Sequence, residues 1–245
     1  MVAVYDLLAS YYDAVAGEAS TEAAFIDGII ARAHPRAVTL LEVACGTGEI
    51  ITALADRYQV AGLDISSGML GAAREKLGGK TPLYLADMSC FRLDVKFDAI
   101  VCVYHGVNHL LEFAAWEGFF DCVYEHLNAG GVFAFDALTK GSLQSMASGP
   151  KIVQRFGENY LRLDVRSSGE AVFDWNVEVF ELQQDGRYEL LTQVIRTATF
   201  PPDRVLASLG ERFGNIETIE SDGGVNDEGE NRIWFVCTKP QSAVQ

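Results

Sequence analysis

Apolar residues recur with two different spacings along this chain. Between residues 37 and 136, short apolar runs alternate with longer stretches in which apolar residues recur every three or four positions. The short runs predict buried strands, and the longer stretches predict helices. Such an alternation is typical of a parallel sheet that is covered by helices on both faces. The pattern therefore predicts a doubly wound α/β fold.

The elements of this region can be bounded from the same pattern. The predicted strands are 37–43, 60–64, 82–87, 97–104 and 131–136, and the predicted helices are 49–58, 67–76 and 112–127. Two further helices, Val4 to Val15 and Thr21 to Arg32, precede Pro35. Because proline ends a helical stretch, we expect residues 1–35 to form a separate N-terminal helical cap.

The spacing of apolar residues changes to two within residues 146–199. Apolar and polar residues alternate over 160–166 and again over 173–179, and the turn pairs Ser168-Gly169 and Asp185-Gly186 lie between successive segments. Alternation broken by such turns predicts antiparallel hairpins with one solvent-facing side. We therefore expect a small antiparallel sheet, inserted into the α/β domain as a lid.

The chain returns to α/β elements after Pro201-Pro202. Residues 203–213 predict a helix, and 215–220 and 232–238 predict two strands, which brings the expected sheet to seven strands. The loop 221–231 is too short for a crossover helix, so the last strand should run antiparallel to its neighbours. The α/β domain is thus expected to comprise 36–145 and 200–245.

Composition narrows the class of ligand. The 245 residues include 19 Lys and Arg against 34 Asp and Glu, a formal net charge of −15. Nucleic acids and anionic membranes would repel such a chain, so we expect a small-molecule substrate and neither of those partners. The start lacks a secretory signal pattern and the five cysteines form no disulfide framework, so we expect a cytoplasmic protein. We expect it to be a monomer or a homodimer.

A glycine-containing turn, Ala44-Cys-Gly-Thr-Gly48, follows the first predicted strand. Ligands of open α/β sheets bind at the carboxyl ends of the strands, where glycines let the backbone approach them closely. The dinucleotide fingerprint is incomplete, because Ile51 stands where a third glycine would be needed. A tight strand-to-helix turn without a ligand would also explain these glycines.

Acidic residues close three successive strand regions, namely Glu42, Asp64 and Asp87. Carboxylates repel a pyrophosphate but suit ribose hydroxyls and amino groups. Asp64 is placed to accept hydrogen bonds from both ribose hydroxyls, and Asp87 to accept one from an adenine amine, with Met69 and Met88 packed against the ring. Any one of these acids alone would suit a solvated loop.

Four segments together resemble the motifs of class I S-adenosylmethionine-dependent methyltransferases. They are Leu40-Leu-Glu-Val-Ala-Cys-Gly-Thr-Gly48, Gly62-Leu-Asp-Ile-Ser66, Leu85-Ala-Asp-Met88 and Phe97-Asp-Ala-Ile-Val101. The opening Tyr5-Asp-x-x-Ala-x-Tyr-Tyr-Asp13 is similar to the N-terminal cap of small-molecule members. The inserted sheet resembles the lid of amino-sugar and glycine-type N-methyltransferases.

The resemblance implies S-adenosylmethionine as cofactor and S-adenosylhomocysteine as product. Glu42 would orient the loop beside the methionine moiety, and the segment 103–107 would line the reacting methyl group. Ala44 departs from the family pattern, which usually has glycine there. The cofactor contacts we expect are Tyr12, Glu42, Ala44, Gly46, Gly48, Asp64, Ile65, Met69, Asp87, Met88, Val103 and Tyr104.

The candidates for a general base are His105, which follows the fourth strand, and Tyr12, with Tyr11, Tyr104 and His109 as further choices. A hydroxyl acceptor usually needs such a base, whereas an amine must arrive unprotonated. His105 would equally suit a helix start, and the tyrosines would equally suit packing between helices. His105 and His109 have a helical metal-ligand spacing, but without a matching acid or thiol we expect no metal.

Three functions remain open on the sequence. The first is methyl transfer to a small metabolite, with nitrogen slightly favoured over oxygen as the accepting atom because of the resemblance of the lid. The second is a non-catalytic module that binds S-adenosylmethionine or its product, which would keep Asp64 and Asp87 but lack an acceptor pocket. A nucleotide-dependent oxidoreductase is the third, and the missing third glycine counts against it.

Overall fold

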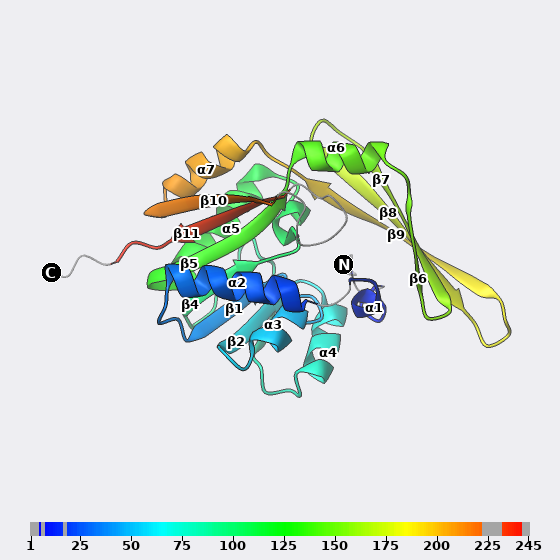
Figure 1. Cartoon of the computed structure of the whole chain (residues 1–245), viewed down its shortest axis with the longest axis horizontal. Helices are drawn as coiled ribbons and strands as arrows, with labels where there is room; N and C mark the ends of the chain where they lie inside the picture. The colour runs from blue at the N-terminus through cyan, green and yellow to red at the C-terminus, as the bar shows by residue number, and fades with distance from the viewer. Residues whose placement is uncertain (1–4, 6–7, 17–18, 222–231, 242–245) are drawn as a thin grey trace.

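The computed structural model describes residues 5, 8–16, 19–221 and 232–241, which form two β-sheets (Figure 1). The larger sheet contains β1 (Thr39–Val43), β2 (Gln59–Asp64), β3 (Leu83–Leu85), β4 (Phe97–Cys102), β5 (Leu127–Leu138), β10 (Asn215–Ser221) and β11 (Arg232–Thr238). The smaller one, which we call the inserted sheet, contains β6 (Ile152–Phe156), β7 (Asn159–Ser167), β8 (Val172–Leu182) and β9 (Tyr188–Ala198).

The larger sheet is the predicted doubly wound one. Its order is β10-β11-β5-β4-β1-β2-β3, and strands β1 to β5 pair in parallel. Strand β11 runs antiparallel to both β5 and β10, as the short connection predicted. The strand order reverses at β1, which lies between β2 and β4. The carboxyl ends of β1 and β4 therefore mark the expected ligand site.

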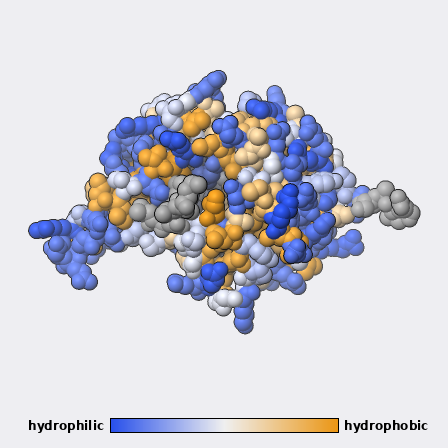
Figure 2. Space-filling model, turned by 180° about the vertical axis from the view of Figure 1, so that it is seen from behind, coloured by the Kyte–Doolittle hydropathy of each residue, from blue (hydrophilic) through white to orange (hydrophobic). Residues whose placement is uncertain are grey.

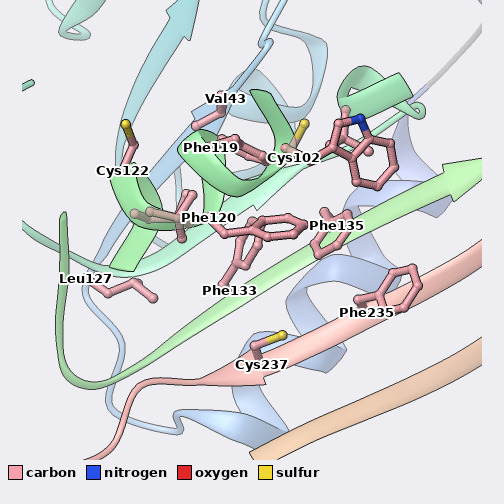
Figure 3. Packing of buried hydrophobic residues seen from close by; sticks show 14 of the residues in the cluster. Val43, Cys102, Phe119, Phe120, Cys122, Leu127, Phe133, Phe135, Phe235 and Cys237 are labelled. Carbon is pink, nitrogen blue, oxygen red and sulfur yellow. The ribbon is translucent and has the colours of Figure 1, made fainter. Parts of the chain in front are cut away.

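Helices cover both faces of this sheet. Helices α2 (Ser20–Ala33) and α3 (Glu49–Leu54) pack on one face, and α5 (Phe113–His126) and α7 (Pro202–Gly210) pack on the other. Figure 3 shows phenylalanine rings gathered between α5 and the strands beneath it. Within this cluster the rings of Phe133 and Phe135 stack at 4.8 Å, and those of Phe135 and Phe235 at 4.9 Å. Buried aromatic contacts of this kind stabilise the fold beyond the area they bury.

The inserted sheet has four antiparallel strands, one more than the alternation predicted. The additional strand is β6, an edge strand whose Ile152 and Val153 are exposed, so no alternating face betrays it. Helix α6 (Lys140–Ser148) was also not predicted, because serines and a glycine dilute its apolar face. Thr139 begins this helix, and its hydroxyl accepts a hydrogen bond from the backbone N–H of Ser142.

Several predicted boundaries differ from the structure; helix α3, for example, ends at Leu54 rather than at residue 58. Strand β4 ends at Cys102 rather than residue 104, and β5 begins at Leu127, directly after α5. The first predicted helix is reduced to α1 (Tyr12–Ala16), with a turn at residues 8–11, while residues 1–4 and 6–7 lie outside the described part. Short cap segments depend on tertiary contacts more than on local helix propensity.

Hydrophilic residues cover much of the surface. Figure 2 shows a largely hydrophilic face on which apolar residues gather in smaller areas. Within the described residues, no helix combines the length and the apolar character that a membrane crossing requires. All five cysteines are free thiols, and four of them are buried.

Asn108 holds together the two points at which the chain enters and leaves the inserted sheet. Its side-chain amide donates to the carbonyl of Ala198 at 2.8 Å, and its Oδ1 accepts from the N–H of Leu138 at 2.9 Å. The hydroxyl of Thr199 donates to the carbonyl of Leu138 at 2.8 Å. Asn108 is completely buried in the 3-10 helix Gly106–His109, so these hydrogen bonds have no water to replace them.

We therefore expect Asn108→Ala to lower the free energy of unfolding by about 2 kcal/mol or more, because it leaves buried backbone groups unpaired. Urea denaturation measures the change. The matched control is Asn176→Ala, which removes a half-buried amide that donates to the carbonyl of Asp164 at 3.1 Å; we expect its effect to stay below about 1 kcal/mol. Equal losses in the two variants would contradict this role of Asn108.

Candidate active site

A cavity of about 690 Å³ lies at the carboxyl ends of β1, β2 and β4. Eleven of the predicted cofactor contacts line it: Tyr12, Glu42, Ala44, Gly46, Asp64, Ile65, Met69, Asp87, Met88, Val103 and Tyr104. Gly48 and His105 are not among its lining residues. Residues that sequence reasoning did not assign complete the wall, including Tyr5, Leu110, Leu111, Val194, Ile195 and Arg196. The cavity therefore extends from the strand ends to the inserted sheet.

The carboxylate of Asp64 organises the floor of this cavity. Its Oδ2 accepts a hydrogen bond from the N–H of Gly46 at 2.8 Å, and its Oδ1 accepts one from the N–H of Ser66 at 2.8 Å. The turn after β1 needs such support, because Ala44 has a φ of 57° and Gly46 a φ of 52°. Left-handed backbone is unfavourable for alanine. Asp64 thus fixes the shape of the turn as well as facing the cavity.

Gly48 acts in the turn rather than in the cavity wall. Its φ of 79° starts helix α3, and a Cβ at this position would lie 3.3 Å from Cδ1 of Leu77. A larger residue would be strained by the backbone and would push against α4 (Ser67–Lys76).

Glu42 is a buried acid in the cavity wall, only 2% exposed. Among the described residues, nothing donates a hydrogen bond to its Oε2. Burial, reinforced by the negative charge of Asp64, raises the pKa of Glu42 well above its usual value. A buried oxygen without a donor is costly, so this oxygen is suited to a ligand that brings an N–H or O–H group.

Asp87 lines another part of the cavity, together with apolar residues. The Oδ1 of Asp87 accepts hydrogen bonds from Ser89, 2.8 Å from its backbone nitrogen and 2.7 Å from its hydroxyl. Met69 is buried and Met88 is half-buried, and Ile65 is exposed at the rim. An acid flanked by sulfur-containing and apolar side chains suits a flat ring that carries an amino group.

The N-terminal segment forms one wall of the cavity, to which it contributes Tyr12. The Nζ of Lys76 lies 2.6 Å from Oδ2 of Asp13 and also contacts Glu49, while the hydroxyl of Thr47 donates to Asp13. Since Asp13 follows Tyr12 directly, these contacts hold the phenol of Tyr12 at the cavity. Burial and the acids Glu42 and Asp64 raise the pKa of Tyr12 to about 12, which keeps it protonated.

Tyr5 and His109 form a polar pair in the wall that faces the inserted sheet. The Tyr5 hydroxyl lies 3.1 Å from His109 Nε2, and His109 Nδ1 lies 3.4 Å from the carbonyl of Arg196. Burial and the proximity of His105 lower the pKa of His109 to about 4. His109 is therefore neutral near pH 7. Sequence reasoning ranked His109 below His105 and overlooked Tyr5, although Tyr5 opens the segment that resembles the N-terminal cap.

His105 lies between the cavity-lining residues Tyr104 and Gly106 but does not itself line the cavity. The ring stacks on Trp175 of β8, with 6.3 Å between centroids and 24° between planes. Its backbone has a φ of 50°, and the preceding Tyr104 has a φ of 53°. Consecutive left-handed residues other than glycine are rare and occur where the surroundings enforce them. A catalytic role for His105 remains a prediction.

Several aromatic and charged side chains of the inserted sheet contact other residues rather than the cavity. Phe173 is buried, and the indole N–H of Trp175 donates to the hydroxyl of Thr197 at 2.9 Å, so both are packing residues of this sheet. Arg162 pairs with Glu178 at 2.5 Å. Tyr11 donates to Glu181. Within the described ranges, no three His, Cys, Asp or Glu side chains come close enough together to hold a metal ion.

Comparison with known proteins identifies the domain around this cavity. A family model described as "Methyltransferase domain" matches residues 40–131. A structure of an S-adenosylmethionine-dependent methyltransferase from Clostridium acetobutylicum ATCC 824 superimposes with a TM-score of 0.81 at 20% identity, covering 96% of this chain and 99% of the other. Residues 40–131 are thus similar to the methyltransferase-domain family, and the whole chain shares its fold with the Clostridium protein.

Proteins similar to this chain include N-methyltransferases that are named for sugar substrates. The dTDP-3-amino-3,6-dideoxy-alpha-D-glucopyranose N,N-dimethyltransferase of Streptomyces fradiae is 35% identical over 112 residues, which is 45% of this chain and 44% of that one. A sugar N-methyltransferase from Streptoalloteichus sp ATCC 53650 has a TM-score of 0.80 at 25% identity, with coverage of 98% and 94%. The chain thus matches this dimethyltransferase over about half of its length, whereas the fold of the Streptoalloteichus protein matches throughout.

The lowered pKa of His109 makes acid stability testable. In the unfolded chain this histidine takes up a proton below its ordinary pKa of 6.5, whereas in the folded methyltransferase it stays neutral until about pH 4. The unfolded state therefore binds more protons between these values, and folding stability falls as the pH drops from 6.5 to 4, by up to about 3 kcal/mol.

Urea denaturation of the wild type and of His109→Gln, each at a series of pH values, measures the contribution of His109 to this pH dependence. Because carboxylates titrate in the same range, the difference between the two curves is the relevant quantity. We expect the advantage of the wild type to shrink as the pH falls from 6.5 to 4. A constant difference would contradict a neutral, buried His109.

Proposed function

We propose that this methyltransferase transfers the methyl group of S-adenosylmethionine to an amine nitrogen of a small metabolite. The proposal rests on one observation, which is that two sets of residues line the same cavity. Acids at the strand ends, Asp64 and Asp87, suit the cofactor, and the pair Tyr5–His109 faces the remaining space. The relatives named for amino-sugar N-methylation support nitrogen as the accepting atom.

The residues present fit S-adenosylmethionine. Asp64 would hold the ribose hydroxyls and Asp87 the adenine amine, while Met69 and Met88 would pack against the ring. The unpaired Oε2 of Glu42 would receive a donor from the methionine moiety. Apart from its two chain neighbours, none of the described residues has an atom within 4 Å of a Cβ built on Gly46, so the backbone there is open to a close ligand. When bound, the sulfonium supplies an already activated methyl group.

The acceptor half of the cavity does three things in this proposal. Leu110, Leu111 and Ile195 exclude water, which keeps an amine in its reactive unprotonated form. The walls hold the acceptor nitrogen in line with the methyl group, and proximity and alignment supply most of the acceleration. The C–S bond breaks as the N–C bond forms, which leaves a methylated ammonium; neutral His109, hydrogen-bonded to Tyr5, accepts the proton of this ammonium at Nε2 or through the phenol and passes it to solvent.

A non-catalytic module that binds S-adenosylmethionine would not need an acceptor half of this kind. The extension of the cavity past the strand ends to Tyr5, His109 and Ile195 favours the transferase over that alternative. The expectations of a cytoplasmic location, of a monomer or homodimer and of no nucleic-acid partner stay predictions from the sequence. The division into a cap (1–35), an α/β domain (36–145 and 200–245) and a lid (146–199) is likewise proposed.

Release of S-adenosylhomocysteine tests the accepting atom. Purified protein with S-adenosylmethionine is offered matched pairs of sugars that differ only in an amino or a hydroxyl group at one carbon. We expect turnover with amino members only, and His109→Gln to lower kcat by about 10- to 100-fold. His34→Gln, at the end of α2 and outside the cavity, is the matched control with unchanged kcat.

The other outcomes of this assay are decisive as well. Turnover of hydroxyl members with inert amino members would contradict nitrogen as the acceptor. Tight binding of S-adenosylhomocysteine without turnover of any acceptor would favour the non-catalytic binding module. Unchanged kcat in His109→Gln would leave proximity as the mechanism and remove the proton-accepting role.

A further inference from the structure

Three buried charged residues from distant parts of the chain meet behind the cavity wall. Asp136 on β5 is completely buried, Glu22 on α2 is 3% exposed and Arg232 on β11 is 7% exposed. Arg232 donates to Oδ2 of Asp136 at 3.1 Å and to Oε2 of Glu22 at 2.7 Å. Placing three charges in the interior costs desolvation, and replacing such groups with apolar residues is often neutral or stabilising. Their presence therefore calls for a task beyond stability.

The second observation is the backbone that Asp136 touches. Its Oδ1 accepts a hydrogen bond from the N–H of His105 at 3.0 Å. His105 and Tyr104 both have left-handed backbone, with φ of 50° and 53°. Such backbone persists in residues other than glycine only where surrounding contacts enforce it. The carboxylate of Asp136 is one such contact, and it is fixed in turn by Arg232.

The turn held in this way forms part of the cavity wall. Val103, Tyr104 and Gly106 line the cavity. A Cβ at Gly106 would lie 3.0 Å from the Cβ of Ala44, so this turn packs directly against the glycine-containing turn after β1. A shift of residues 104–106 would therefore move both the wall and the loop that faces the cofactor.

We propose that Asp136 is a positioning residue, which holds the strained turn at residues 104–106 in the shape that the cavity needs, and that Arg232 and Glu22 orient it. This role rests on the proposed function, because the turn is expected to line the bound cofactor and acceptor. Asp136 touches neither of them. The side chain of His105 adds to this contact, since its Nδ1 lies 3.7 Å from Oδ2 of Asp136.

The electrostatics of the cluster agree with this role. Burial alone would raise the pKa of Asp136, but hydrogen bonds from His105 and the charge of Arg232 lower it below its usual value. Asp136 therefore stays a carboxylate, the form that accepts hydrogen bonds most strongly.

A double-mutant cycle separates positioning from simple support of the fold. Glycine adopts left-handed backbone without strain, so His105→Gly removes the need for a holding contact. We expect Asp136→Ala to raise the Kd for S-adenosylhomocysteine about tenfold in the wild-type background, and about threefold or less in the His105→Gly background. Calorimetry gives the four affinities. An equal loss in both backgrounds would overturn the proposal.

The same cycle in thermal unfolding needs no ligand. We expect Asp136→Ala to lower Tm by several degrees, and by clearly less when residue 105 is glycine. Glu22→Gln is the graded comparison, because Glu22 acts on Asp136 only through Arg232; its Tm shift should depend on residue 105 less than that of Asp136→Ala does. Asp136→Asn, which keeps an oxygen for the His105 N–H, serves if the alanine variant does not fold.

The two proposals fail differently. If the wild type does not bind S-adenosylhomocysteine, the proposed function fails, while the coupling of residues 136 and 105 in Tm still tests the positioning role. If the wild type binds but neither affinity nor Tm shows coupling, Asp136 supports only the packing of β5 and β11, and the positioning role fails.

Discussion

The shape of the cavity at the strand ends depends on one carboxylate, which joins two turns. Asp64, the last residue of β2, accepts hydrogen bonds from Gly46 in the turn after β1 and from Ser66 at the start of α4. Parallel strands bring these turns together, but neither would keep its shape without an acceptor for its N–H groups. The same carboxylate lines the cavity, so fold and ligand site share a single group. This sharing explains why the backbone at Ala44 can remain left-handed.

Charge divides the cavity into two halves. Carboxylates from the ends of β1, β2 and the segment after β3 occupy one half, where a ligand with hydroxyl and amino groups satisfies them. The other half carries Arg196 and otherwise neutral groups, and burial keeps the ring of His109 there unprotonated. Methyl transfer requires little proton movement, so an acceptor half that excludes water suits the chemistry.

Local patterns in the sequence were enough to predict the α/β fold, the reversed last strand and the acids on the cavity floor. Each of these depends on periodicity, a turn or a position at a strand end, all of which are visible within a few residues. Features that depend on contacts between residues far apart in the sequence were not predicted. Tyr5 meets His109 across more than 100 residues, Arg232 meets Glu22 across more than 200, and β6 is recognisable only once its partner β7 is placed.

The central claim is that Asp64 and the glycine-containing turn bind S-adenosylmethionine. Calorimetric titration of the wild type and of Asp64→Ala with S-adenosylmethionine and S-adenosylhomocysteine, with NADH as a control ligand, tests it most directly. We predict micromolar binding of both sulfur compounds to the wild type, no binding of NADH, and a loss of about 100-fold or more in Asp64→Ala, since hydrogen bonds to a charged group are lost. Absence of binding by the wild type, or unchanged affinity in Asp64→Ala, would contradict the account.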